Sequence, residues 1–188
     1  WFPLVIGAII FFVMITWNRG REILLERLRS DDIPLEPFLE SLLAHPPVRV
    51  SGTSIFLTSN VNGVPHALLH NLAHNQVLHE CVVFLTVDYL EIPRVLKEER
   101  VSIKPLIGNC YQVTVKYGFK DEPNLPVALE MCKQHGLEFE PLKTSYFLSR
   151  EIVVPSPGGG MTQWQERIFA TMARNAGNAA EYFKLPAN

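Results

Sequence analysis

The sequence has few cysteines and no local excess of one charge. Its three cysteines are widely spaced and form no C-x-x-C pair, which excludes a zinc ribbon or a thioredoxin-type motif and is typical of reduced thiols in the cytosol. The 17 basic and 19 acidic residues are mixed, and the net charge of −2 leaves no basic stripe for a nucleic acid. We therefore expect no nucleic-acid partner. The roughly 170 residues outside the apolar N-terminus are enough for one domain with its own core.

Local motifs for catalysis and phosphate binding are missing as well. No serine stands in a G-x-S-x-G elbow, and no cysteine has a catalytic signature around it. A glycine triplet at residues 158–160 precedes an expected helix, yet the lysine and hydroxyl of a G-K-[ST] loop are absent. A flexible connector over residues 155–160 is therefore the favoured interpretation. The sequence predicts neither an enzyme nor a cofactor.

The N-terminus carries an apolar run without a charge, residues 1–17, followed at once by arginines. A helix of about 17 residues reaches roughly 25 Å, slightly less than the roughly 30 Å hydrocarbon layer of a membrane. Because no methionine precedes Trp1, we infer that the chain begins part-way into a helix of a longer protein. Basic residues after the run indicate a cytoplasmic exit. Residues 1–17 are predicted to be part of a transmembrane helix, with the chain after about Asn18 in the cytoplasm.

Two other interpretations of this run fit less well. A secretory signal peptide carries its positive charges before the apolar stretch and ends in a small-residue cleavage site, and neither feature is present. A helix packed on the surface of a soluble core keeps a polar stripe, whereas apolar side chains cover every face of this run. A membrane span remains the favoured interpretation.

The remaining residues predict an α/β fold. Residues 18–45 are expected to form juxtamembrane helices, of which the first is amphipathic and the second ends at His45 before two prolines. Residues 46–188 are expected to form a cytosolic α/β domain, a mixed β-sheet with flanking helices, preceded by the one transmembrane helix. The expected strands are residues 53–58, 80–87, 145–149 and a hairpin of 101–107 with 111–117, and the expected helices are residues 65–75, 125–135 and 162–175.

Three histidines lie close together at His70, His74 and His79. On a helix, His70 and His74 share one face, which is the spacing of a zinc-binding pair. The glutamate of H-E-x-x-H is absent, and the local sequence supplies no third ligand. A solvated helix face is the better interpretation, and no metal site is predicted.

Several strings of the sequence resemble one transporter family. They are P-P-V-R-V-S-G-T at residues 46–53, H-A-L-L-H-N-L-A-H-N-Q-V-L-H-E at 66–80, Y-G-F-K-D-E-P-N at 117–124 and T-S-Y-F-L-S-R-E at 144–151. In this order and spacing they closely resemble the C-terminal region of the bacterial Kup potassium transporters, the low-affinity potassium uptake proteins of the inner membrane. The opening W-F-P-L-V-I-G-A is similar to the last membrane helix of that family, so the resemblance covers essentially the whole chain.

The resemblance implies a potassium and proton symporter of the bacterial inner membrane, in which the upstream helices carry the ion path. Potassium and protons, the lipid bilayer and a second copy in a homodimer are the implied partners. Because this chain holds one span, it offers no potassium ligand, since such ligands must converge from several segments. The cytosolic domain is then expected to be regulatory or dimer-forming.

Two other functions stay open for the cytosolic domain. The first is a ligand-sensing module, for example for a nucleotide. Many α/β sheets bind ligands beyond the ends of their strands, and saturable binding to this domain would support that function. A membrane-anchored enzyme is the weaker alternative. The candidate recognition or interface surface is taken from the family-like strings, although packing explains their glycine and apolar positions equally well; it consists of Arg49, Thr53, His70, Asn71, His74, Asn75 and Glu80.

Overall fold

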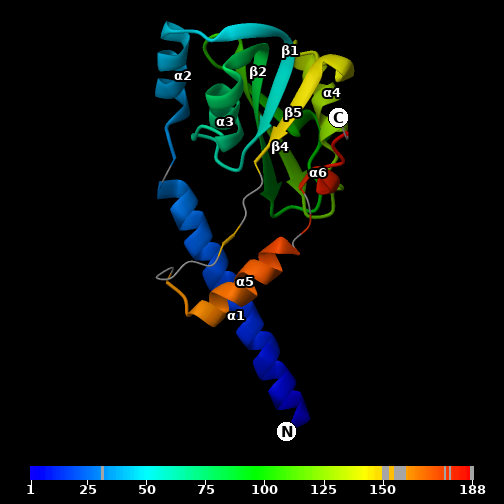
Figure 1. Ribbon diagram of the computed structural model, residues 1–188. Coiled ribbons are helices and arrows are strands. Elements are labelled where there is room, and N and C mark those ends of the chain that lie inside the picture. The colour runs from blue at the N-terminus through cyan, green and yellow to red at the C-terminus, as the bar shows by residue number, and fades with distance from the viewer. Residues whose placement is uncertain (31, 150–152, 155–159, 176, 178, 187–188) are drawn as a thin grey trace. The chain divides into compact units, whose positions relative to one another are not determined.

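The computed structural model describes residues 1–30, 32–149, 153–154, 160–175, 177 and 179–186 (Figure 1). The chain divides into two compact units. One unit comprises Trp1–Asp32 with Arg150–Gly177, and the other comprises Ile33–Ser149 with Asn178–Asn188. We call them the helical unit and the sheet unit and describe each by itself.

The described part of the helical unit is built on helices α1 and α5. Helix α1, Phe2–Ser30, runs for 29 residues without interruption, so the predicted continuation of the apolar helix into the charged segment is confirmed. Its Phe2–Leu28 portion is long and apolar enough to cross a membrane, and only 6% of its most apolar window is buried. Helix α5, Gln163–Arg174, packs against α1. The connector predicted at residues 155–160 lies outside the described residues except for Gly160.

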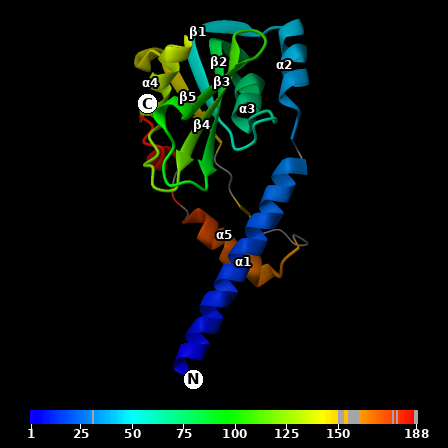
Figure 2. The same cartoon turned by 180° about the vertical axis from the view of Figure 1, so that it is seen from behind.

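The sheet unit is built on a five-stranded mixed sheet (Figures 1 and 2). Its spatial order is β3-β4-β2-β1-β5. The pairs β1–β2, β1–β5 and β2–β4 are parallel, and the hairpin β3–β4 is antiparallel, as predicted around Gly108. The predicted fold class, a mixed sheet with flanking helices after one apolar helix, is confirmed. The strands are β1 Val48–Leu57, β2 Val77–Leu90, β3 Val101–Pro105, β4 Cys110–Gly118 and β5 Thr144–Leu148.

Helices cover both faces of this sheet. Successive strand residues point to opposite sides, so each face carries its own set of apolar side chains to be covered. Phe56 and Phe84 face a core closed by α2, Leu35–Ala44, and α3, His66–Asn75. Figure 2 shows these two helices on one side of the sheet and α4 on the other. The neighbouring strand residues, such as Ile55 and Val83, face the second core with α4. The elements of that side are α4 Leu125–Met131, η2 Cys132–His135 and α6 Ala179–Tyr182, and the remaining short helices are η1 Lys97–Glu99 and η3 Pro141–Lys143.

The strands β1 and β2 begin earlier than the sequence indicates. They pair from Val48 and Val77 onward, and the register then shifts between Val50 and Thr53. Gly52 lies in this bulge at φ 103°, where the carbonyl oxygen of Lys143 leaves no room for a side chain. A glycine there is explained by backbone conformation and crowding together. The bulge separates the polar start of β1 from the buried second half of the strand.

The helix predicted over residues 125–135 is present as α4 followed by the 3-10 turn η2. It ends at Gly136, which adopts φ 81° and donates its backbone N–H to the carbonyl of Lys133, so the predicted glycine cap is confirmed. The four-residue α6 has too few residues to give a periodic signal and was not predicted. All three cysteines are free, and burial raises the pKa of Cys110 and Cys132 to about 11.

Candidate functional site

Arg49 is placed by β1 against two backbone carbonyls. Its Nη1 donates to the carbonyl of His79 at 2.7 Å, and its Nη2 donates to that of Gly108 at 3.3 Å. These carbonyls belong to β2 and to the turn between β3 and β4. Hydrogen bonds from a charged donor are among the stronger ones in proteins. Arg49 therefore connects β1 to β2 and to the turn between β3 and β4, at the edge where β1 and β2 begin.

Asn71 and Asn75 tie the end of α3 to the start of β2. Asn71 is only 6% exposed, and its Nδ2 donates to the carbonyl of Val77 at 3.0 Å. Its Oδ1 accepts from Nδ2 of Asn75 at 2.8 Å. The residue between helix and strand, Gln76, adopts φ 56°, a left-handed conformation that lets the chain turn sharply. Asn71 thus satisfies the carbonyl of Val77 at this tight connection, and Asn75 holds the Asn71 side chain.

Thr53 and Glu80 flank the same region. Thr53 follows the bulge in β1, and its side chain forms a hydrogen bond with the side chain of Cys81. The pKa of Cys81 is nevertheless raised, because its thiol is half-buried. Glu80 is exposed, while its backbone carbonyl accepts from Nδ2 of Asn109 at 2.7 Å. The side chain of Glu80 is therefore open to a partner.

The three neighbouring histidines are separated by the fold. His70 and His74 are exposed on α3 with their rings stacked at 5.9 Å between centroids. His79 lies on β2, its ring packs edge-on against Phe147, and burial lowers its pKa. Among the described residues no group of three or more His, Cys, Asp or Glu side chains is arranged to hold a metal ion. Of the predicted surface, His70, His74, Asn75 and Glu80 are exposed, and Asn75 is engaged with Asn71.

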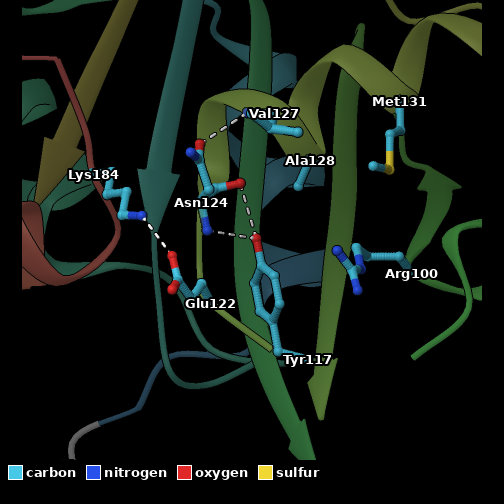
Figure 3. A pocket seen from close by; sticks show the side chains of 8 residues that line it. All are labelled: Arg100, Tyr117, Glu122, Asn124, Val127, Ala128, Met131 and Lys184. Carbon is cyan, nitrogen blue, oxygen red and sulfur yellow. Dashed lines mark hydrogen bonds and ion pairs between the residues drawn. The ribbon is translucent and has the colours of Figure 1, made fainter. Parts of the chain in front are cut away.

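The structure also holds a pocket that sequence patterns did not indicate (Figure 3). It has a volume of about 190 Å³ and lies in the sheet unit beside α4. Its wall combines β4, the turn that follows it, one face of α4 and the segment after α6. The lining residues are Arg100, Tyr117, Glu122, Asn124, Val127, Ala128, Met131 and Lys184.

The cationic side of the pocket is Arg100. Its Nη2 lies 3.1 Å from a carboxylate oxygen of Asp121 and donates to the carbonyl of Val95 at 3.0 Å. Its guanidinium lies 5.3 Å from the ring centroid of Tyr117, within cation–π range. The Nε atom of Arg100 is buried and has no hydrogen-bond partner among the described residues. Backbone N–H groups of Val95 and Gly118 hold the pKa of Asp121 below its ordinary value, so the pair stays charged.

Tyr117 and Asn124 provide neutral polar groups in the lining of the pocket. The Tyr117 hydroxyl donates to the carbonyl of Asn124 at 2.9 Å and accepts from its N–H at 3.1 Å, as Figure 3 shows. Asn124 also caps α4, because its Oδ1 accepts from the N–H of Val127 at 3.2 Å. Burial raises the pKa of Tyr117, which keeps its hydroxyl neutral. At the rim, Lys184 pairs with Glu122 at 3.1 Å.

Six of the eight lining residues lie within residues 117–131, whereas Arg100 and Lys184 come from distant parts of the chain, so no single local motif predicted the pocket. The string Y-G-F-K-D-E-P-N at residues 117–124 was the available signal, since it supplies Tyr117, Glu122 and Asn124 as well as Asp121. Paired charges, a neutral hydroxyl and an apolar helix face are suited to holding a small polar molecule by hydrogen bonds and packing.

Comparison with known proteins identifies the family. The profile described as the K+ potassium transporter C-terminal domain matches residues 51–188. The chain belongs to this transporter family. The resemblance drawn from the family-like strings is thereby confirmed, and Tyr117, Asn124 and the exposed histidines of α3 all lie within the matched domain.

Curated relatives in this transporter family match the whole chain. It is 74% identical over 188 residues to a probable potassium transport system protein Kup of Nitrosospira multiformis and 53% identical to that of Herminiimonas arsenicoxydans. A probable Kup 2 protein of Cupriavidus necator is 56% identical over 191 residues. The chain spans about 30% of the length of each of these relatives. No solved structure matches it.

Proposed function

We propose that the chain is the C-terminal part of a potassium:proton symporter that takes up potassium across the bacterial inner membrane. The observation that supports this most is the match of the entire chain to proteins named for potassium transport. The ion path lies in upstream helices, because the ligands that replace the hydration shell of potassium must converge from several segments. In this proposal helix α1 is the last span, and the arginines after it support a cytoplasmic position for the sheet unit.

In this proposal the sheet unit regulates transport or joins two copies of the transporter. The uninterrupted course of α1 from its apolar half into its charged half supports a regulatory role. A helix without a break transmits a displacement along its axis, whereas a flexible linker dissipates it. The exposed His70, His74 and Glu80 offer a surface for the second copy or for another partner.

Rubidium uptake tests the proposal, since rubidium substitutes for potassium. The full-length transporter is expressed in cells without other potassium uptake systems and compared with a version cut after Asn18. We expect uptake by the intact protein and uptake with an altered rate after truncation. If the intact protein takes up no rubidium, the transporter proposal is wrong.

The pocket beside α4 supports ligand sensing as a second candidate function for the sheet unit. Nucleotides are a suitable probe, because they combine anionic groups for Arg100 with an apolar ring for the α4 face. We expect saturable binding of a labelled nucleotide to the purified full-length transporter, lost in Val127→Trp, which fills the pocket from its exposed rim. Leu142→Trp, at a fully exposed position that does not line the pocket, is the control. Equal binding by both variants excludes the pocket as the site.

A further inference from the structure

Helix α5 has an apolar and a basic side. Its start is fixed by Gln165, whose side-chain oxygen accepts from both the N–H and the hydroxyl of Thr162, at 3.2 and 2.7 Å. Trp164, Ile168 and Met172 recur four residues apart and form one stripe along the helix. We call these three residues the apolar stripe of α5. A polar stripe lies beside it and contains Arg167, Thr171 and Arg174, all exposed.

Helix α5 packs directly on α1 through Trp164 and Phe169. The ring of Trp164 stacks on Phe12 with centroids 4.8 Å apart and planes at 19°. The ring of Phe169 lies 5.5 Å from that of Trp17 and presses on the backbone of Gly20 so closely that a side chain there has no space. Figures 1 and 2 both show α5 crossing α1. The two helices are therefore in intimate contact over the stretch from Phe12 to Gly20.

This contact fixes the level of α5 along α1. Phe12 lies within the uncharged run, and Arg19 is the first charged residue after it. At about 1.5 Å per residue, Phe12 is roughly 10 Å before Arg19 along the helix axis. If α1 crosses the membrane as proposed above, the contact with α5 extends from the edge of the hydrocarbon layer near Arg19 to roughly 10 Å inside it, the depth at which an interfacial helix buries its apolar face.

The apolar stripe of α5 continues the apolar surface of α1. Trp164 remains 52% exposed although it stacks on Phe12, and Ile168 and Met172 are only half-buried. On α1, Phe11 and Ile15 are exposed next to the contact. Tryptophan is favoured at membrane interfaces, and arginines on the polar face of such a helix meet anionic headgroups.

We propose that α5 is an interfacial helix that binds the cytoplasmic surface of the lipid bilayer. Its apolar stripe inserts at the boundary of headgroups and acyl chains, while Arg167 and Arg174 contact anionic headgroups. The chain after the sheet unit thus returns to the membrane, and the C-terminal part of the transporter is held there by α1 and by α5. This inference rests on the proposed membrane span of α1.

Spin labels on single cysteines test the position of α5 in the full-length transporter. The protein carries no other cysteine, retains rubidium uptake and is reconstituted in vesicles of neutral and anionic phospholipid. Ile168→Cys and Met172→Cys report the apolar stripe, and Arg167→Cys and Thr171→Cys are the matched controls on the polar stripe. We expect labels at 168 and 172 to collide several-fold more with oxygen, which concentrates in lipid, than with a water-soluble nickel chelate. Labels at 167 and 171 show the reverse preference.

Two results overturn the inference. Equal access of the nickel chelate to all four positions places α5 in water. Labels at 168 and 172 that are immobile and shielded from both reagents place another helix of the transporter on the apolar stripe. Labels at Ile9, Ile10 and Phe11 of α1 separate the two proposals: if the nickel chelate reaches them, the membrane span is wrong as well, and if it does not, only the position of α5 is wrong.

Discussion

Phe56 in β1 and Phe11 in α1 are the same residue type in opposite surroundings. Phe56 is fully buried and stacks on Phe147 with ring centroids 4.7 Å apart. Phe11 keeps 66% of its surface exposed on a helix whose apolar window is almost entirely uncovered. The sheet unit therefore buries its own apolar side chains between sheet and helices, whereas α1 does not.

The difference shows what each unit needs from its surroundings. Burying a phenylalanine side chain stabilises a fold by roughly 1.5–3 kcal/mol, and the sheet unit obtains this from its own residues. The apolar surface of α1 is left uncovered by the described residues, and in the proposed membrane span lipid or other helices of the transporter cover it. Substitutions of the same kind in the two units are thus expected to have different consequences, which hydrogen exchange of the solubilised full-length protein can separate by region.

The largest effect is expected for Phe56→Ala. Removing a fully buried aromatic side chain costs about 3–5 kcal/mol, so the free energy of opening of β2 falls by that amount. Phe11→Ala is the matched control and leaves the opening of β2 unchanged. Amide exchange of β2 measures both variants. A comparable loss in Phe11→Ala contradicts the division of the chain into two separately packed units.

The next effect concerns two glycines of the sheet unit. Gly52→Ala combines a strained φ with a collision against the carbonyl oxygen of Lys143 and is expected to cost about 3 kcal/mol. Gly136→Ala has the strained φ alone, because nothing lies within 4 Å, and is expected to cost about 1–2 kcal/mol. Exchange of β1 amides measures the first and exchange of α4 amides the second. An equal loss of stability in Gly52→Ala and Gly136→Ala argues against a contribution from crowding at the bulge.

In the helical unit, Gly20→Leu is expected to separate α5 from α1. The new side chain meets the ring of Phe169, and overpacking of this kind costs about 1–3 kcal/mol. We expect faster amide exchange in α5 and no change in β2. Gly7→Leu, in the same helix with nothing within 4 Å, is the control. Unchanged exchange of α5 in Gly20→Leu contradicts the packing of the two helices.

Asn71→Ala tests whether the family-like string of α3 serves the fold. It removes the donor to the carbonyl of Val77 and is expected to cost about 1–2 kcal/mol, because that carbonyl loses its partner near a buried position. His70→Ala changes an exposed ring on the same helix and is expected to stay within about 0.5 kcal/mol. Exchange at the start of β2 compares the two. An equal loss of stability in the two variants means that Asn71 does not stabilise the connection between α3 and β2.

The smallest effect is a pH dependence at Asp121. Its folded pKa is lowered by the backbone N–H groups of Val95 and Gly118, so its stabilising effect is complete above the ordinary value of 3.8 and is lost as the pH falls through the lower folded pKa. We expect acidification below pH 3.8 to destabilise the end of β4 more in the wild type than in Asp121→Asn. The measurement is exchange of β4 amides, corrected for the intrinsic effect of pH. If acid destabilises the end of β4 equally in the wild type and in Asp121→Asn, Asp121 is not the group responsible for the pH dependence.

Much of the architecture was predictable because its signals are local. The uncharged run gave α1, the apolar strand residues 82–87 gave the centre of β2, and Gly108 with Gly136 gave the hairpin turn and the helix cap. The starts of β1 and β2 were missed, since Arg49 and His79 make these segments look polar. Their strand conformation comes from pairing with each other rather than from their own composition.

The candidate site was less predictable because it depends on contacts between distant residues. His79 was grouped with His70 and His74, but the switch from helix to strand at Gln76 sends its ring toward Phe147. Arg100 and Lys184 are 84 positions apart and line the same pocket only in the folded protein. Similarly, nothing in the sequence of α5 indicated that Trp164 and Phe169 would pack on α1.

The central claim, that the sheet unit controls transport through α1, is tested most directly by breaking that helix. A long Gly/Ser insertion after Asn18 of the full-length transporter interrupts α1, and the same insertion after the exposed Glu138 is the control. The rubidium uptake rate and its regulation are measured in cells without other potassium uptake systems. We predict that the insertion after Asn18 changes them and that the control does not. Unchanged uptake and regulation after the insertion at Asn18 would contradict coupling through this helix.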